Sequence, residues 1–169
     1  MKVQVFDNFV SEKECDVLTK WIIDNKDTEI FTPVEMGGNR VSTRFTYEVD
    51  WQYPKEAYEI KERLIKKIGV KKKFHPPYKD GIVASCAFPG DFVYEHTDPE
   101  WFEGYATVHC NVVVSEPDSG GIAIIDGKEY VMNRGNILCY PVSEVLHEIT
   151  KIEGSKLRLM WVFGFCVAK

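Results

Sequence analysis

Residues 88–98 read Phe-Pro-Gly-Asp-Phe-Val-Tyr-Glu-His-Thr-Asp, a Pro-Gly turn followed by a short extended run that ends in a His-x-Asp triplet. Residues two apart in a strand point to the same side, so His96 and Asp98 share a face, and we expect Tyr94 to share it with them. One strand end therefore offers two adjacent metal ligands. A third ligand must come from elsewhere, and His147, near the start of a later strand, is the best candidate.

Two imidazoles and one carboxylate can occupy one face of a ferrous ion and leave the other face open, as dioxygen chemistry requires. An HxD triplet also arises by chance, and then it carries no chemistry. The order of the landmarks downstream favours the metal site: Gly120-Gly121, Gly135, Tyr140-Pro141 and then His147. The other two histidines are weaker candidates, since His75 lies in a proline-rich loop and His109 lies mid-strand.

Lys156 and Arg158 form a cationic pair at the start of an otherwise apolar late strand, where they point the same way. Burying an unpaired cation is costly, so at least one of them must meet an anion. One interpretation is a surface carboxylate such as Glu153. The other is a dicarboxylate ligand that is anchored to iron at one end and clamped by a guanidinium or ammonium group at the other.

Short apolar runs alternate with Gly, Pro and Asp turns in the second half of the chain, which is typical of a β-sandwich or barrel. The predicted strands there are Ile82–Phe88, Phe92–His96, Thr107–Ser115, Gly121–Ile125, Ile137–Tyr140, Val145–Ile149 and Leu157–Phe165. In the first half we predict a strand over Val3–Phe6, a helix over Glu12–Asn25 that begins with a capping box, a hairpin arm over Arg40–Val49 and a second helix over Pro54–Ile68.

The chain of 169 residues is 44% hydrophobic, enough for one core and too short for two ordinary domains. We expect a single domain in which residues 1–80 form an α/β support region and residues 81–169 form the β core. The net charge of −5 argues against a nucleic-acid partner, and Lys71–Lys73 is the sole basic cluster.

Residues Met1–Phe9 alternate between apolar and polar, unlike a secretory leader, and no apolar run is long enough to span a membrane. The five cysteines are an odd number without CxxC spacing, which fits neither a zinc site nor a disulfide framework. We therefore expect buried free thiols in a cytoplasmic protein.

The sequence resembles the iron- and 2-oxoglutarate-dependent dioxygenases, most closely the prolyl 4-hydroxylase-like branch. The resemblance runs over nearly the whole chain, through the order and spacing of its motifs. These motifs are Val5-Phe6-Asp7-Asn8-Phe9 before the capped helix, Arg40-Val41-Ser42, Phe88-Pro89-Gly90-Asp91-Phe92, His96-Thr97-Asp98, Gly120-Gly121, Tyr140-Pro141 and His147-Glu148-Ile149.

The resemblance implies a mainly β fold, a double-stranded β-helix of the jelly-roll or cupin-like kind with the N-terminal helices packed on one sheet. It implies that His96, Asp98 and His147 bind Fe(II), with 2-oxoglutarate as cosubstrate and O2 as oxidant. Ascorbate is a further candidate cofactor. The remote carboxylate of 2-oxoglutarate would meet Arg158 or Lys156. Arg158 offers a bidentate fork, and Lys156 fits the Gly-x-Arg/Lys spacing after Gly154.

One departure from the family concerns hydrogen bonding to the cosubstrate. Related hydroxylases often have a tyrosine at the position of Phe88, and Phe88 cannot donate a hydrogen bond. Tyr94, or His109 and Asn111 on a neighbouring strand, are the candidates to replace it. For His109, a satisfied core histidine and a contact to 2-oxoglutarate are both open interpretations.

The reaction implied is hydroxylation of an amino-acid residue, with proline first, in a peptide or protein, accompanied by release of succinate and CO2. The Arg40–Val49 hairpin and Trp101 with Phe102 are candidates for the substrate rim or a lid. The alternatives are the same chemistry on a free amino acid or small metabolite, nucleobase demethylation, which the acidic charge disfavours, and a non-catalytic cupin-like binding module.

Overall fold

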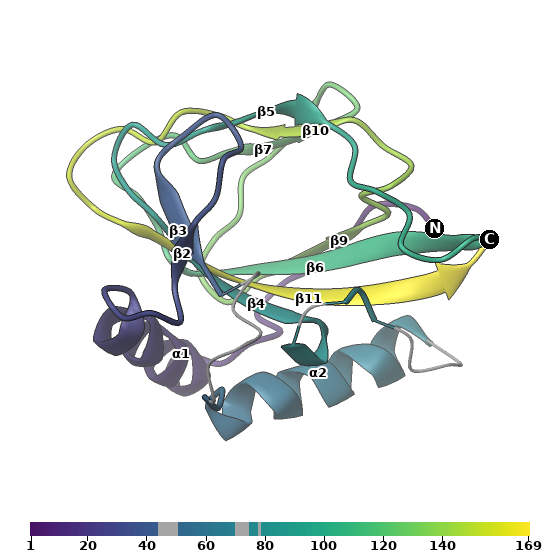
Figure 1. The fold of residues 1–169 in the computed structure, drawn as a ribbon, viewed down its shortest axis with the longest axis horizontal. Helices are drawn as coiled ribbons and strands as arrows, with labels where there is room; N and C mark the ends of the chain where they lie inside the picture. The colour runs from purple at the N-terminus through teal and green to yellow at the C-terminus, as the bar shows by residue number, and fades with distance from the viewer. Residues whose placement is uncertain (44–50, 70–74, 78) are drawn as a thin grey trace.

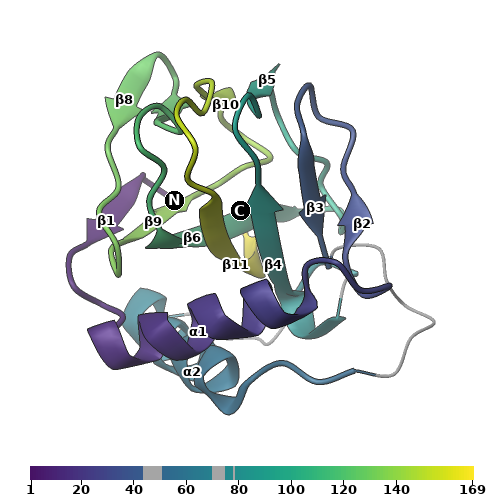
Figure 2. The same cartoon turned by 90° about the vertical axis from the view of Figure 1, so that its left-hand side faces the viewer.

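Two antiparallel sheets face each other in the computed structural model, with both α-helices on the outer face of the larger sheet (Figure 1). The structure describes residues 1–43, 51–69, 75–77 and 79–169. Figure 2 shows the same layering from the side, with α1 and α2 lying beneath the large sheet. The mainly β class and the position of the helices agree with the expectation from sequence.

The larger sheet has seven strands and the smaller has four. In spatial order the large sheet contains β1 (Gln4–Phe6), β9 (Ile137–Tyr140), β6 (Tyr105–Ser115), β11 (Arg158–Ala168), β4 (Ile82–Ala87), β3 (Arg40–Ser42) and β2 (Thr32–Pro33). The small sheet contains β5 (Val93–His96), β10 (His147–Ile149), β7 (Ala123–Ile125) and β8 (Lys128–Tyr130). From β4 to β11 the chain alternates between the sheets, except that β7 and β8 form a hairpin within the small sheet, and this brings distant parts of the sequence into contact.

Both helices begin where their capping residues predict. Helix α1 (Glu12–Asn25) starts after Ser11, whose side chain and that of Glu14 form the reciprocal hydrogen bonds of a capping box. Helix α2 (Lys55–Ile68) starts after Pro54, whose missing amide hydrogen costs nothing at a helix start, and ends at Gly69 in the left-handed conformation. A short 3-10 turn, η1 (Lys79–Gly81), leads into β4.

Strand β11 is buried on both faces, one of which packs against the helices while the other faces the small sheet. Trp161, Phe163 and Phe165 point toward the helices and are at most 1% exposed. They join the main core with helix residues such as Leu18 and Ile60. The alternate residues of β11 point toward the small sheet, which is the face that carries the candidate site. A strand buried on both sides explains why the sequence from 157 to 165 is almost continuously apolar.

The second core fills the space between the two sheets. It is smaller than the main core and consists of buried side chains from both layers, namely Val93, Ala123, Ile125, Leu138, Tyr140, Val142 and Ile149. Its members come from four strands and one loop, so this cluster fixes the distance between the sheets.

Several predicted boundaries differ from the observed ones at the strand ends. Strands β6 and β11 are longer than predicted, β10 is shorter, and the two-residue β2 and the three-residue β8 were missed, because such short pairs carry no periodic signal. The hairpin arm is described only over Arg40–Ser42, and its remaining residues after Thr43, like Lys71–Lys73, lie outside the described residues.

All five cysteines are buried and free, as expected. In the described part of the chain, no helix combines the length and apolar character that crossing a bilayer requires.

Candidate metal centre

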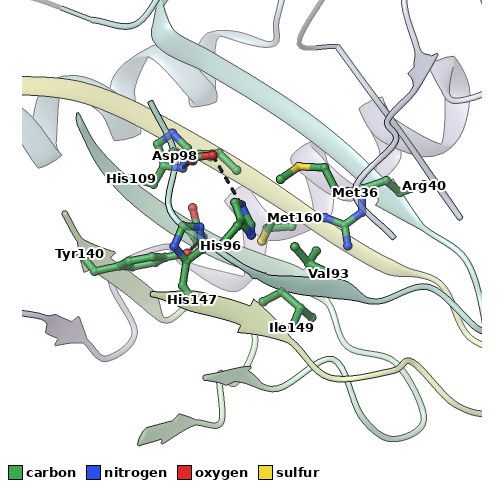
Figure 3. Close-up of a pocket in the computed structure, with 12 residues that line it drawn as sticks. Met36, Arg40, Val93, His96, Asp98, His109, Tyr140, His147, Ile149 and Met160 are labelled. Atoms are coloured by element: carbon green, nitrogen blue, oxygen red, sulfur yellow. Dashed lines mark hydrogen bonds and ion pairs between the residues drawn. The ribbon is translucent and has the colours of Figure 1, made fainter. Parts of the chain in front are cut away.

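The three predicted ligands lie together between the two sheets. His96 and His147 are direct partners in the β5–β10 pairing, with ring centroids 4.3 Å apart. Asp98 lies two residues beyond the end of β5, where its backbone N–H donates to the carbonyl of Val142 at 2.9 Å. One potential ligand atom from each of the three side chains lies within 4.8 Å of the other two (Figure 3). Strand pairing therefore assembles a cluster whose members are 51 residues apart in sequence.

Backbone carbonyls fix the orientation of both imidazoles. His96 Nδ1 lies 2.8 Å from the carbonyl oxygen of Tyr94, and His147 Nδ1 lies 3.2 Å from that of Val145. A carbonyl can only accept, so each Nδ1 must carry the hydrogen. In the neutral ring the lone pair then lies on Nε2, which in His96 is 3.5 Å from Asp98 Oδ1. This is the tautomer in which a histidine binds a metal through Nε2.

The expectation that Tyr94 shares the face of His96 is wrong. His147 pairs with His96 but Ile149 pairs with Val93, so β5 carries one more residue than β10 over this interval. This β-bulge reverses the alternation, and Val93 points into the pocket with His96 while Tyr94 is 51% exposed. Tyr94 instead packs its ring against the edge of His96 at 5.6 Å between centroids.

His109 and Asn111 extend the polar end of the pocket, as their alternation along β6 predicts. His109 is buried, and its Nδ1 lies 3.5 Å from Asp98 Oδ2. Asn111 Nδ2 lies 3.2 Å from the hydroxyl oxygen of Tyr140, whose ring packs edge-on against His147. These three side chains contact the triad or its immediate neighbours, so they can orient its ligands.

The pocket that contains the triad is apolar on its other walls, with one exception. Its lining residues are Met36, Arg40, Val93, His96, Asp98, His109, Asn111, Tyr140, His147, Ile149, Met160 and Val162. Arg40 enters on the side away from Tyr140 in Figure 3 and is ion-paired to the fully buried Asp91, with 2.5 Å between Nη2 and Oδ2. Among the described residues, Arg40 is therefore the Arg or Lys that lines this pocket.

Arg158 is the buried member of the predicted cationic pair. It begins β11, is 4% exposed and lines a second pocket, which shares no lining residue with that of the triad. Burial and then the nearby cation Arg40 lower the pKa of Arg158 to about 10, against the opposing effects of Tyr140 and Asp91. Gly121, at φ +66°, leaves the space that the Arg158 side chain fills, since a Cβ there would lie 2.8 Å from Arg158 Cδ.

Lys156 lies outside both pockets. Its side chain is 70% exposed and pairs with Asp118, with 3.1 Å between Nζ and Oδ1. The Asp118 carboxylate also accepts hydrogen bonds from the backbone of Ser155 and Lys156, and these bonds together hold the pKa of Asp118 at about 2. Lys156 thus has the surface role that was one of the two interpretations of the pair, with Asp118 in place of Glu153.

Two polar pocket residues were not among the sequence candidates for contacts to the metal or the cosubstrate, although both belong to motifs of the resemblance. Tyr140 could have been found from the alternation of β9, because it points the same way as Leu138 in a strand that pairs with His109. Arg40 gave no such signal, since its partner Asp91 is 51 residues away. Of the other candidates, Phe88 packs on the main core, and Trp101 and Phe102 are exposed and line neither pocket.

No protein-family model matches the sequence, and comparison with curated proteins gives no match. Solved structures do match the fold. A prolyl 4-hydroxylase from Pseudomonas putida superposes with a TM-score of 0.68 at 16% identity, covering 99% of this chain and 92% of that one.

Two further structures superpose equally well. A prolyl hydroxylase from Trichoplax adhaerens in complex with a peptide fragment of the hypoxia inducible factor oxygen degradation domain has a TM-score of 0.68 at 11% identity, with coverage of 96% and 83%. HygX from Streptomyces hygroscopicus, with nickel and 2-oxoglutarate bound, has a TM-score of 0.68 at 10% identity, with coverage of 98% and 82%. The fold is the double-stranded β-helix of these oxygenases, as predicted.

Proposed function

We propose that the protein is an Fe(II)- and 2-oxoglutarate-dependent dioxygenase that hydroxylates an amino-acid residue, with a prolyl residue of a peptide or protein as the first candidate. The observation that carries this proposal is the meeting of His96, Asp98 and His147, whose potential ligand atoms lie within 4.8 Å of one another in a pocket between the sheets. The fold of the oxygenases supports it.

The donor set fits a ferrous ion. Two imidazole nitrogens and one carboxylate oxygen are the ligands of the two-histidine, one-carboxylate iron sites. Such a site leaves coordination positions for a bidentate 2-oxo acid and for O2. When bound, the iron with 2-oxoglutarate and O2 supplies the oxidation, which converts the cosubstrate to succinate and CO2 and transfers one oxygen atom to the substrate.

The residues of this chain hold and orient the reactants. His96, Asp98 and His147 hold the metal, and the carbonyls of Tyr94 and Val145 keep the two rings in the productive tautomer. Arg158 binds the remote carboxylate of 2-oxoglutarate, because a buried guanidinium is stabilised by an anionic ligand. His109, Asn111 and Tyr140 position the ligands and exclude water at the polar end.

A peptide substrate is supported by the neighbouring structures, two of which are prolyl hydroxylases and one of which contains a bound peptide. The alternative is the same chemistry on a free amino acid. Comparing peptides with free amino acids as substrates distinguishes the two. Tyr94, Phe92 and Trp101 offer exposed aromatic surface on β5 and the segments flanking it, which suits packing against a proline ring.

Incubation of the iron-loaded protein with 2-oxoglutarate and proline-containing peptides, or with free amino acids, tests the proposal. We expect succinate in step with a product that has gained one oxygen atom, detected by mass spectrometry, with peptides more active than free amino acids. Asp98→Ala should abolish both products. Absence of succinate with every substrate, despite bound iron, would contradict the assignment as a dioxygenase.

A further inference from the structure

We infer that Arg40, which lines the pocket of the triad, is a second carboxylate-binding cation, which acts with Arg158 on the remote carboxylate of the bound dicarboxylate and so selects 2-oxoglutarate over 2-oxo acids that lack that group. The inference rests on the proposed function and assigns a role to a residue of β3, on the far side of β4 from β11. It starts from sheet register.

Arg40 and Arg158 lie in one row across the large sheet. Each pairs directly with Ala87, Arg40 from β3 and Arg158 from β11. Directly opposite residues in antiparallel strands point to the same face, so both arginines project toward the small sheet. Their Cα atoms are separated by two strand spacings, about 10 Å. The small methyl group of Ala87 between them leaves room for both guanidinium groups and for a ligand.

The two positive charges of Arg40 and Arg158 are not both matched by an ion pair. Arg40 pairs with Asp91, which is fully buried, whereas no ion pair or hydrogen bond to Arg158 is found among the described residues. The ion pair of Arg40 with Asp91 is therefore the one that these two guanidinium groups make among the described residues, since Glu116 lines the Arg158 pocket without an ion pair to either arginine. A buried cation without a counter-ion is costly, so a ligand that brings one more carboxylate is stabilised here.

Arg40 also has unused hydrogen-bonding capacity. Its Nη2 donates to Asp91, but its Nε is buried and has no hydrogen-bond partner. The side chain is 10% exposed and lines the same pocket as the triad, with Met160 and Val93 on its walls. A carboxylate arriving in this pocket would satisfy that donor, and Asp91 keeps the guanidinium in place before the ligand binds.

This arrangement explains the missing tyrosine of the family pattern. Phe88 packs on the main core, and the residue before it, Ala87 of β4, pairs with both Arg40 and Arg158. Arg40 from the adjacent strand lines the pocket of the triad and supplies the donor that an aromatic hydroxyl would otherwise provide.

Calorimetric titration of the Ni(II)-loaded protein separates this inference from the proposed function. The two probes are 2-oxoglutarate and 2-oxovalerate, which has a methyl group in place of the remote carboxylate. We expect Arg40→Gln to weaken 2-oxoglutarate binding about ten- to a hundredfold, the loss of one charge-assisted contact, and to change 2-oxovalerate binding less than about twofold.

Arg40→Gln leaves Asp91 buried without its partner, so the double variant Arg40→Gln/Asp91→Asn is measured beside it, and melting temperatures confirm folding. Lys156→Gln is the matched control, because it removes a cation outside both pockets. Equal 2-oxoglutarate affinity in wild type and in the folded Arg40 variants, or an equal loss for both 2-oxo acids, overturns the inference alone. A wild-type protein that binds neither 2-oxo acid overturns the proposed function together with it.

Discussion

Arg158 and Lys156 stand two positions apart, and alternation alone gives them the same direction. The structure separates them because β11 begins at Arg158, so Lys156 belongs to the loop before it and turns toward Asp118. Sequence could predict that a cation of this pair meets an anion. It could not predict which cation, because the boundary of a strand depends on pairing with β4 and β6.

Replacing the two cations one at a time tests this division. Arg158→Gln should raise the KM for 2-oxoglutarate about ten- to a hundredfold, since it removes a buried charge-assisted contact of about 1.5–3 kcal/mol. Lys156→Gln should leave the KM within about twofold, because an exposed ion pair contributes little. Steady-state succinate formation measures both. A larger rise in KM for Lys156→Gln than for Arg158→Gln would show that Arg158 is not the residue that contacts the cosubstrate.

At the scale of elements, the alternation of side chains along β5 predicts only part of the site correctly. It predicts that His96 and Asp98 serve one site, and the structure brings them together with His147. It fails for Tyr94, because the extra residue of the β-bulge depends on how β5 pairs with β10. The helices were predictable to the residue in α1, since capping is a local interaction that the sequence displays directly.

Glu14 links the two helices and makes their stability depend on pH. It completes the capping box with Ser11 and pairs with Arg63 of α2, 2.5 Å between Oε1 and Nη1. Partial burial raises the pKa of Glu14, but hydrogen bonds from Arg63 and Ser11 outweigh burial and bring the pKa to about 2.

A carboxyl group whose pKa is lowered by folding stabilises the protein above its unfolded pKa, here 4.5, and loses this effect as the pH falls toward about 2. Glu14→Gln should therefore cost about 1–2 kcal/mol near neutral pH, a modest value because Arg63 is 41% exposed. Urea unfolding of both proteins should show this difference shrinking below pH 4.5. A difference that grows in acid would refute the assigned role of Glu14.

At the scale of the whole molecule, the large sheet lies between the helical layer and the candidate site. Its outer face packs on α1 and α2 through the main core, and its inner face carries Asn111, Tyr140 and Arg158. The family resemblance predicted that the helices pack on one sheet, and apolar spacing predicted that the helix over Glu12–Asn25 faces the core. Neither could predict the Arg40–Asp91 pair, which exists only once the β2–β3 hairpin lies beside β4.

Leu18→Ala should destabilise the protein without changing its site. Leu18 is fully buried between α1 and the large sheet, so its truncation should lower the free energy of unfolding by about 2–5 kcal/mol. Because the triad lies on the opposite face of that sheet, metal affinity of the folded variant should stay within about twofold of wild type. Chemical denaturation and Ni(II) titration measure the two quantities. Loss of metal affinity in the folded variant would show that the helical layer also shapes the site.

The central claim is that His96, Asp98 and His147 hold one iron to which a 2-oxo acid chelates. Anaerobic titration of the Fe(II)-loaded protein with 2-oxoglutarate tests it most directly, because chelation of Fe(II) by a 2-oxo acid produces a visible charge-transfer band. We predict a saturable band with one iron per chain, absent in Asp98→Ala and retained in His75→Ala, whose ring lies in a different pocket. No band in the wild type, or an equal band in Asp98→Ala, would contradict the account.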